Sequence, residues 1–347
     1  APGTQFKSYC DGVYMSTSPL GDYTVAPENP CSSRPEGFIA GAGHSSTFQD
    51  LYGNYWHVST MTISQKHMFE RRLGLFPMFF DEDGDLSTWT GFGDFPFVMP
   101  RKKITGIKDI QPTGMLLSYK KPLEVSSEAS EHPKTFASDE DIRTYWSAKT
   151  GEKGEWVAMD LQKPCTVTSV QINFAEHETQ LFGRSPEAYH QYLLEYSSNN
   201  KTWRTLEDKR RNTTDVPHDY IELRAPVKAR YIRLTNYHMP TGTFALADLR
   251  VFGHGGGKIP AEIRTVHITR SATDKCVATL KWEKHPDAIG VMIRYGTRRD
   301  HLYHAYQVMD ADSLTIRSLN GASKYYFSID AFNENGIRKG STITEVE

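Results

Sequence analysis

Apolar and polar residues alternate along most of this 347-residue chain. The clearest alternating runs occupy residues 156–161, 167–174, 231–235, 279–282 and 325–331. A strand that buries one face shows this alternation, whereas an amphipathic helix repeats its apolar positions about every 3.6 residues. Helical spacing is absent almost everywhere, and Gly and Pro interrupt the runs at short intervals. The pattern predicts an all-β protein of short strands joined by turns.

Composition supports this fold class and excludes some partners. Aromatic residues, which are enriched in strands, make up 12% of the chain. The formal net charge is −2 and the basic run at residues 209–211 is short, so we expect no nucleic-acid partner. No apolar run approaches the roughly 20 residues that span a bilayer, so we expect no membrane span. The start lacks both an initiating Met and a signal-peptide core, and we expect it to be a cut end.

The four cysteines, Cys10, Cys31, Cys165 and Cys276, are widely spaced and form no Cys-x-x-Cys motif. This spacing argues against a structural zinc site or a redox motif. Pairing of Cys10 with Cys31 stays open beside the favoured interpretation of four small buried thiols.

Two stretches predict domain boundaries. A basic triplet at residues 101–103 lies in a polar stretch between Pro100 and Pro122, and a Gly-rich run at residues 254–257 is followed by Pro260. We therefore expect three domains, at residues 1–105, 114–254 and 258–347, which the chain length allows.

The first segment has a turn at residues 18–23, a Gly-flanked His44 and a hairpin at residues 50–58. In this order the motifs resemble the last two blades of glycoside hydrolase family 43, a five-bladed β-propeller that cleaves arabinosides and xylosides. Asp22 stands where that family often has Pro. The resemblance implies that His44 lies near the propeller axis, facing a metal ion or ordered water. A turn histidine hydrogen-bonded to backbone is the alternative.

Inverting hydrolysis needs one protonated carboxyl and one ionised carboxylate across a single pocket. The resemblance implies that the general base, the pKa-tuning aspartate and the acidic glutamate come from earlier blades, so we assign no catalytic residue in this chain. We expect the missing blades to be a partner, and the chain alone not to hydrolyse glycosides although its parent does. For the acidic turn at residues 81–85, a solvated loop is favoured over a Ca²⁺ loop because the EF-hand pattern is absent.

The middle segment carries five ordered motifs, at residues 126–127, 136–147, 155–161, 229–234 and 247–253. They resemble the discoidin, or coagulation factor 5/8 type C, family and most closely the family 32 carbohydrate-binding modules, which are jelly-roll β-sandwiches. The resemblance implies a structural Ca²⁺ on the oxygen donors Asp139, Asp141, Thr144 and Asp248. Asp248 replaces the family's usual Glu, and Glu140 stands where the family has Gly. An acidic loop capped by Arg143 is the alternative.

Sugar recognition needs an aromatic face for the ring and fixed polar groups for the hydroxyls. The loop at residues 177–185 offers both, so we predict a ligand site at His177, Phe182 and Arg184, with Tyr145 nearby. An ordinary exposed loop that packs against the propeller is the alternative. We expect Trp146 and Trp156 to be core residues.

The last segment has Trp282 early and Tyr325 late, with alternating residues after Tyr325. It resembles a fibronectin type III sandwich, in which a buried tryptophan and a loop-tying tyrosine are anchors. We expect a spacing or docking role.

Together these features predict the carboxy-terminal part of a secreted, periplasmic or cell-surface glycosidase of the xylosidase or arabinosidase type, acting on plant polysaccharide. The alternative is a non-enzymatic lectin or adhesin, and a third hypothesis is a purely structural protein. The predicted partner is a polysaccharide or oligosaccharide.

Overall fold

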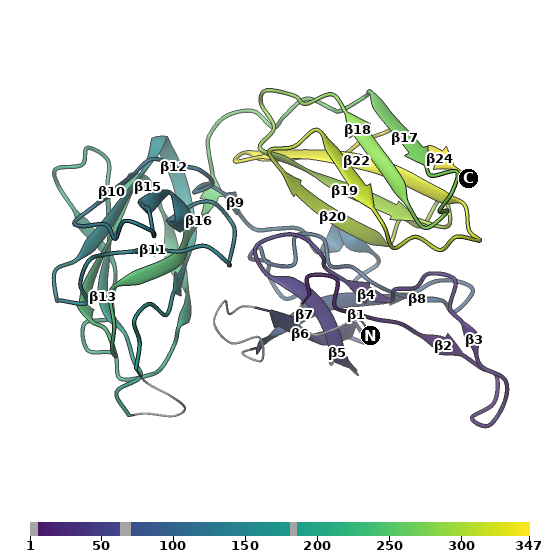
Figure 1. The fold of residues 1–347 in the computed structure, drawn as a ribbon, viewed down its shortest axis with the longest axis horizontal. Coiled ribbons are helices and arrows are strands. Elements are labelled where there is room, and N and C mark those ends of the chain that lie inside the picture. The colour runs from purple at the N-terminus through teal and green to yellow at the C-terminus, as the bar shows by residue number, and fades with distance from the viewer. Residues whose placement is uncertain (1–5, 63–70, 181–185) are drawn as a thin grey trace. The chain divides into compact units, whose positions relative to one another are not determined.

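The computed structural model describes residues 6–62, 71–180 and 186–347. Within these ranges the protein is all-β, as predicted, and its helical turns are short 3₁₀ segments, η1 (Ile107–Asp109) and η2 (Lys134–Ala137). No helix in the described ranges is long and apolar enough to cross a membrane. The chain forms two compact units, which we call unit 1 (residues 1–112 with 258–347) and unit 2 (residues 113–257) (Figure 1). The three-domain division stays a prediction, and its first and last segments share unit 1.

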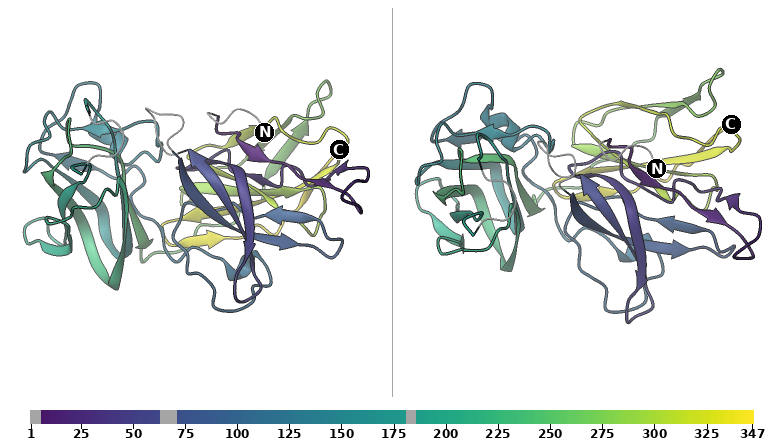
Figure 2. Two further views of the ribbon diagram at one scale, coloured as in Figure 1. Left: turned by 90° about the horizontal axis from the view of Figure 1, so that it is seen from below. Right: turned by 60° about the horizontal axis from the view of Figure 1, so that its bottom comes forward.

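The first segment of unit 1 contains a four-stranded antiparallel meander, visible in Figure 2. Its strands follow one another in chain order: β5 (Ala40–Gln49), β6 (Tyr55–Thr62), β7 (Arg71–Phe80) and β8 (Leu86–Thr88). Two short strand pairs precede it: β1 (Cys10–Asp11) with β4 (Ser32–Ser33), and β2 (Tyr14–Met15) with β3 (Thr24–Val25).

The β5–β6 hairpin forms where the sequence predicts it, and Asp50 shapes its turn. The Asp50 carboxylate accepts backbone N–H groups of Tyr52 and Asn54 and the indole N–H of Trp56. Burial opposes ionisation, but these hydrogen bonds lower the pKa of Asp50 to about 2. The turn therefore depends on an ionised Asp50, and Trp56 is anchored in the core.

The last segment of unit 1 is a two-sheet sandwich. One sheet has β17 (Val266–Arg270), β18 (Ala278–Trp282) and β21 (Ser313–Ile316); the other has β19 (Gly290–Gly296), β20 (His304–Met309), β22 (Tyr325–Asn333), β23 (Gly336–Arg338) and β24 (Thr344–Val346). Trp282 and Tyr325 are buried between them, and the Tyr325 hydroxyl accepts the Asn320 N–H at 2.9 Å. These features agree with a fibronectin type III-like sandwich, which stays a prediction.

Unit 2 is an eight-stranded β-sandwich of discoidin-like architecture. Its strands are β9 (Met115–Leu116), β10 (Leu123–Val125), β11 (Trp146–Ser147), β12 (Trp156–Phe174), β13 (Gln191–Ser197), β14 (Arg204–Asp208), β15 (His218–His238) and β16 (Ala245–His254). β12 and β15 pair along three stretches, separated by register shifts between Asp160 and Cys165 and between Val167 and Ser169, and both strands bend around one apolar core. Trp146 lies in that core, as predicted, whereas Trp156 is only half-buried.

All four cysteines are free thiols. The β1–β4 register places Cys10 opposite Ser33, so Cys31 is not its cross-strand partner.

Candidate functional site

Three aromatic side chains from separate loops of unit 2 form a cluster, which we call the ring cluster. His132 lies between β10 and η2, Tyr145 directly precedes β11, and His177 follows β12. The rings of His132 and Tyr145 stack with centroids 4.1 Å apart, and His177 lies edge-on to His132 at 4.5 Å. All three residues are half-buried, so the ring cluster is partly open to solvent.

Hydrogen bonds and charge give the ring cluster a defined polar edge. The Tyr145 hydroxyl lies 3.0 Å from His177 Nδ1, and His177 Nε2 lies 3.9 Å from the exposed Glu178 carboxylate. Burial and then the Glu178 charge raise the pKa of Tyr145, which keeps the phenol neutral at physiological pH. A neutral phenol, two imidazoles and a carboxylate suit a ligand that carries hydroxyl groups on an apolar ring.

Backbone contacts hold the three loops together. The Ser147 N–H donates to the His132 carbonyl at 3.2 Å, and the Thr243 N–H donates to the His177 carbonyl at 3.2 Å. Gly242 has φ of +77°, and a Cβ there would lie 2.1 Å from the His177 carbonyl oxygen. Only glycine permits this close approach, so Gly242 fixes the position of the His177 loop.

The structure brings together two of the four predicted ligand residues, Tyr145 and His177. Phe182 and Arg184 lie outside the described residues. The sequence did not predict His132, which lies between the motifs at residues 126–127 and 136–147, because no local pattern distinguishes it from another loop histidine. The Ala129–His132 bridge and its bonds to β11 bring it against Tyr145.

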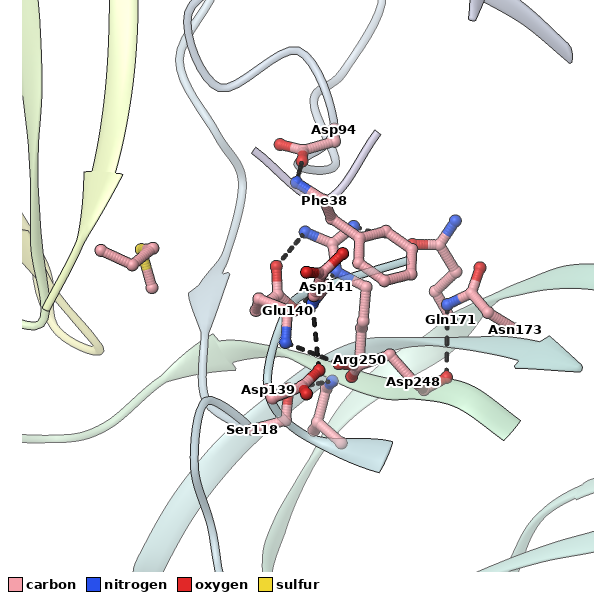
Figure 3. Close-up of polar contacts among 12 residues, drawn as sticks. Phe38, Asp94, Ser118, Asp139, Glu140, Asp141, Gln171, Asn173, Asp248 and Arg250 are labelled. Carbon is pink, nitrogen blue, oxygen red and sulfur yellow. Dashed lines mark hydrogen bonds and ion pairs between the residues drawn. The ribbon is translucent and has the colours of Figure 1, made fainter. Parts of the chain in front are cut away.

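The structure brings the predicted calcium-loop residues close together, and Figure 3 shows Asp139, Asp141 and Asp248 among them. Asp139 Oδ2 accepts the Thr144 hydroxyl at 2.7 Å, and Asp248 Oδ2 accepts the Glu140 N–H at 2.9 Å. The charge on Asp139 also acts on Asp248. The Asp141 carboxylate instead accepts the Arg143 N–H at 2.9 Å and caps the following turn.

One oxygen of these predicted ligands, Asp248 Oδ1, is well suited to bind a hard cation. Asp248 is fully buried, and its Oδ1 has no hydrogen-bond partner among the residues that the structure describes. Burial, and next the charge on Glu140, raise the pKa of Asp248, and burial also raises that of Asp139. A bound Ca²⁺ would relieve both costs. Within the described ranges no three Asp, Glu, His or Cys side chains form a metal site, so Thr144 and backbone carbonyls would have to complete it.

A buried ion pair borders this loop. Glu140 has φ of +62°, and its carboxylate binds Arg250 in bidentate fashion, with Nε–Oε1 at 2.8 Å and Nη2–Oε2 at 3.0 Å. Gln171 Oε1 accepts a further bond from Arg250 Nη1 at 2.9 Å. Arg250, rather than the exposed Arg143, is thus the arginine that neutralises the loop, and no local sequence pattern links Arg250 to Glu140, 110 positions earlier.

His44 lies on β5 in a strained stretch of unit 1. Its φ is +52°, and that of Ala42 is +90°. The His44 N–H donates to Asp11 Oδ1 at 3.0 Å, and its carbonyl accepts the Thr60 hydroxyl at 3.3 Å. The side chain is exposed. A position near a propeller axis stays a prediction, as does the absence of catalytic residues from this chain.

Comparisons with known proteins concern unit 2. Residues 122–248 match the F5/8 type C domain family. Similar solved structures include a chitosan-binding module 1 from a Paenibacillus sp. IK-5 chitosanase/glucanase (22% identity, TM-score 0.34, 40% of this chain and 99% of that chain). Another is the family 32 carbohydrate-binding module of Clostridium perfringens NanJ in complex with galactose (20%, 0.34, 40% and 98%). A search of curated proteins found no match.

Proposed function

We propose that unit 2 is a carbohydrate-binding module whose ligand site is the ring cluster. The observation that carries this proposal is the stacked His132–Tyr145 pair, bonded to His177, in a domain that matches the F5/8 type C family. The exposed faces offer apolar surface to a sugar ring, and the surrounding polar atoms offer hydrogen bonds to its hydroxyls.

Calorimetric titration of the full chain tests this proposal. The panel contains arabino- and xylo-oligosaccharides, with galactose and chitotriose, the ligands named for two of the similar modules. We expect one sugar class to bind, and Tyr145→Ala to weaken it about tenfold or more because stacking area and a polar partner are both lost. Tyr220→Ala, which removes another partly exposed tyrosine of unit 2, is the matched control and should leave the Kd unchanged. Absence of binding to every sugar would contradict the proposal.

The finer proposal is that the parent protein is a secreted family 43-like glycoside hydrolase acting on plant polysaccharide, with its remaining propeller blades as partner. The four-stranded meander supports it, because a propeller blade is such a sheet. A non-enzymatic lectin or adhesin is the alternative. Upstream coding sequence separates the two: Asp, Asp and Glu on three preceding blades support the hydrolase, and their absence supports the lectin.

We also propose that Asp139, Thr144 and Asp248 hold a structural Ca²⁺. The ion would supply only a positive charge that ties the loop at residues 138–144 to β16. Addition of Ca²⁺ to chelator-treated protein should raise the Tm of unit 2, and Asp248→Asn should abolish this rise because it removes the buried anionic donor. Asp141→Asn is the matched control and should retain the response. An equal Tm with and without Ca²⁺ would contradict this assignment.

A further inference from the structure

The acidic turn between β7 and β8 is ordered by its first residue. Asp81 Oδ1 accepts the N–H groups of Asp83 at 3.0 Å and Asp85 at 2.8 Å. The Asp81 side chain is only 3% exposed although the turn is highly charged. A solvated loop would leave this carboxylate in water, so the turn is built around something that covers it.

Side chains of the last sandwich of unit 1 cover the turn. Arg298, two residues after β19, places Nη1 3.3 Å from Asp81 Oδ2 and 2.6 Å from Asp83 Oδ2. The Tyr303 hydroxyl donates to Asp81 Oδ2 at 3.0 Å. One carboxylate thus receives a cation and a phenol from a segment more than 200 positions later in the chain. The guanidinium charge thus compensates two carboxylates of the acidic turn.

Further buried contacts join the first and last segments of unit 1. The Thr297 hydroxyl donates to the buried Glu28 carboxylate. Arg34, which is ion-paired to Asp94 at 2.5 Å, also reaches Gln307 Oε1 at 3.3 Å, and all three side chains are buried. The Phe92 ring meets Phe332 edge-to-face at 5.2 Å. Buried aromatic and ionic contacts of this kind belong to a packed interior, not to a chain that only touches a spacer.

We infer that the acidic turn at residues 81–85 is a docking element for Arg298 and Tyr303, and that the last sandwich is a structural brace for residues 6–112. The two segments form one cooperative folding unit, into which unit 2 is inserted. This goes beyond the proposed carbohydrate binding and assigns the last sandwich a role other than spacing. Both ends of unit 2 therefore connect to segments of unit 1.

Hydrogen exchange on the full chain tests the inference. If the two segments of unit 1 are coupled, a substitution in one segment lowers the protection of backbone amides in the other. In Arg298→Ala we expect amides of β7 and β8 to exchange about tenfold faster or more, with β17 and β18 still protected. Asp83→Ala removes the partner of Arg298 on the acidic turn, so the backbone amides of residues 297–304 should exchange faster. Lys324→Ala breaks an exposed pair with Glu345 inside the sandwich and should leave β7 and β8 unchanged.

The double variant Asp83→Ala with Arg298→Ala should lose less protection than the sum of the losses in the two single variants, because both remove the same contact. The inference is overturned if both single variants change exchange only within their own segment. Protection of residues 81–85 by Ca²⁺ in the unaltered protein would also overturn it, because the turn would then be a cation loop.

Discussion

Arg250 and Glu140 bury a complete ion pair, with the arginine side chain 0% exposed and the glutamate side chain 4% exposed. Both charges have left water, so each depends on the other for compensation. Glu140 accepts a left-handed backbone, which is costly for a residue with a side chain, in order to reach Arg250. The contact therefore specifies how the loop at residues 138–144 meets β16.

Replacement of Arg250 by Met should leave the Glu140 carboxylate buried without a cation. We expect a loss of about 3–5 kcal/mol in the free energy of unfolding of unit 2, measured by denaturant titration. Arg230→Met breaks the partly exposed pair with Asp160 and should cost about 1 kcal/mol or less. Similar losses in the two variants would contradict the role assigned to burial.

The buried His190 should make the stability of unit 2 depend on pH. Its ring stacks on Phe174 with centroids 3.9 Å apart, and burial, followed by the charges of His238 and His218, lowers its pKa to about 3. In the unfolded chain His190 takes up a proton near pH 6.5, whereas in the folded protein it stays neutral. The contribution of His190 to the free energy of unfolding is therefore complete above pH 6.5 and is lost as the pH falls toward 3. By pH 5 the loss should be about 2 kcal/mol.

Denaturation midpoints at pH 7 and pH 5 measure this effect. His190→Phe keeps a ring against Phe174 and removes the titrating group, so its midpoint should fall less between the two pH values. His254→Phe, at an exposed position of β16, is the control and should respond as the unaltered protein does. An equal pH response in His190→Phe would contradict the assignment.

At the scale of elements, the alternating pattern predicts strands well because each strand buries one face. It does not show that residues 156–161 and 167–174 belong to one bent strand, β12, which pairs with β15 on both sides of the bend. Tyr145 and His177 were predicted from loop composition. His132 was not, because its contact with Tyr145 depends on how two loops bond to β11.

Gly242 should affect sugar binding because it fixes the position of the His177 loop. Gly242→Ala places a Cβ against the His177 carbonyl, so the loop must move, and sugar binding measured by calorimetry should weaken at least about tenfold. Gly154→Ala also substitutes a positive-φ glycine of unit 2, with φ of +102°, but meets no atom within 4 Å. Binding should survive in that control. Equal binding in both variants would show that the His177 loop does not form the site.

For the whole molecule, the sequence suggests three domains in series, while contacts join the first and last segments in unit 1. Linkers and strand patterns reveal where segments end, but not which segments pack together. Arg298 and the acidic turn have ordinary surface composition until the fold brings them into contact. In this arrangement the segment that forms unit 2 is inserted between the two segments of unit 1.

The account depends most on the ring cluster as the place where sugar binds. Histidine-ring NMR of the full chain during titration with the oligosaccharide that binds in calorimetry observes this cluster directly. We predict that the ring signals of His132 and His177 shift together with one Kd, while those of His190 and His304, both buried elsewhere, stay in place. Binding heat without movement of the His132 and His177 signals would contradict the account.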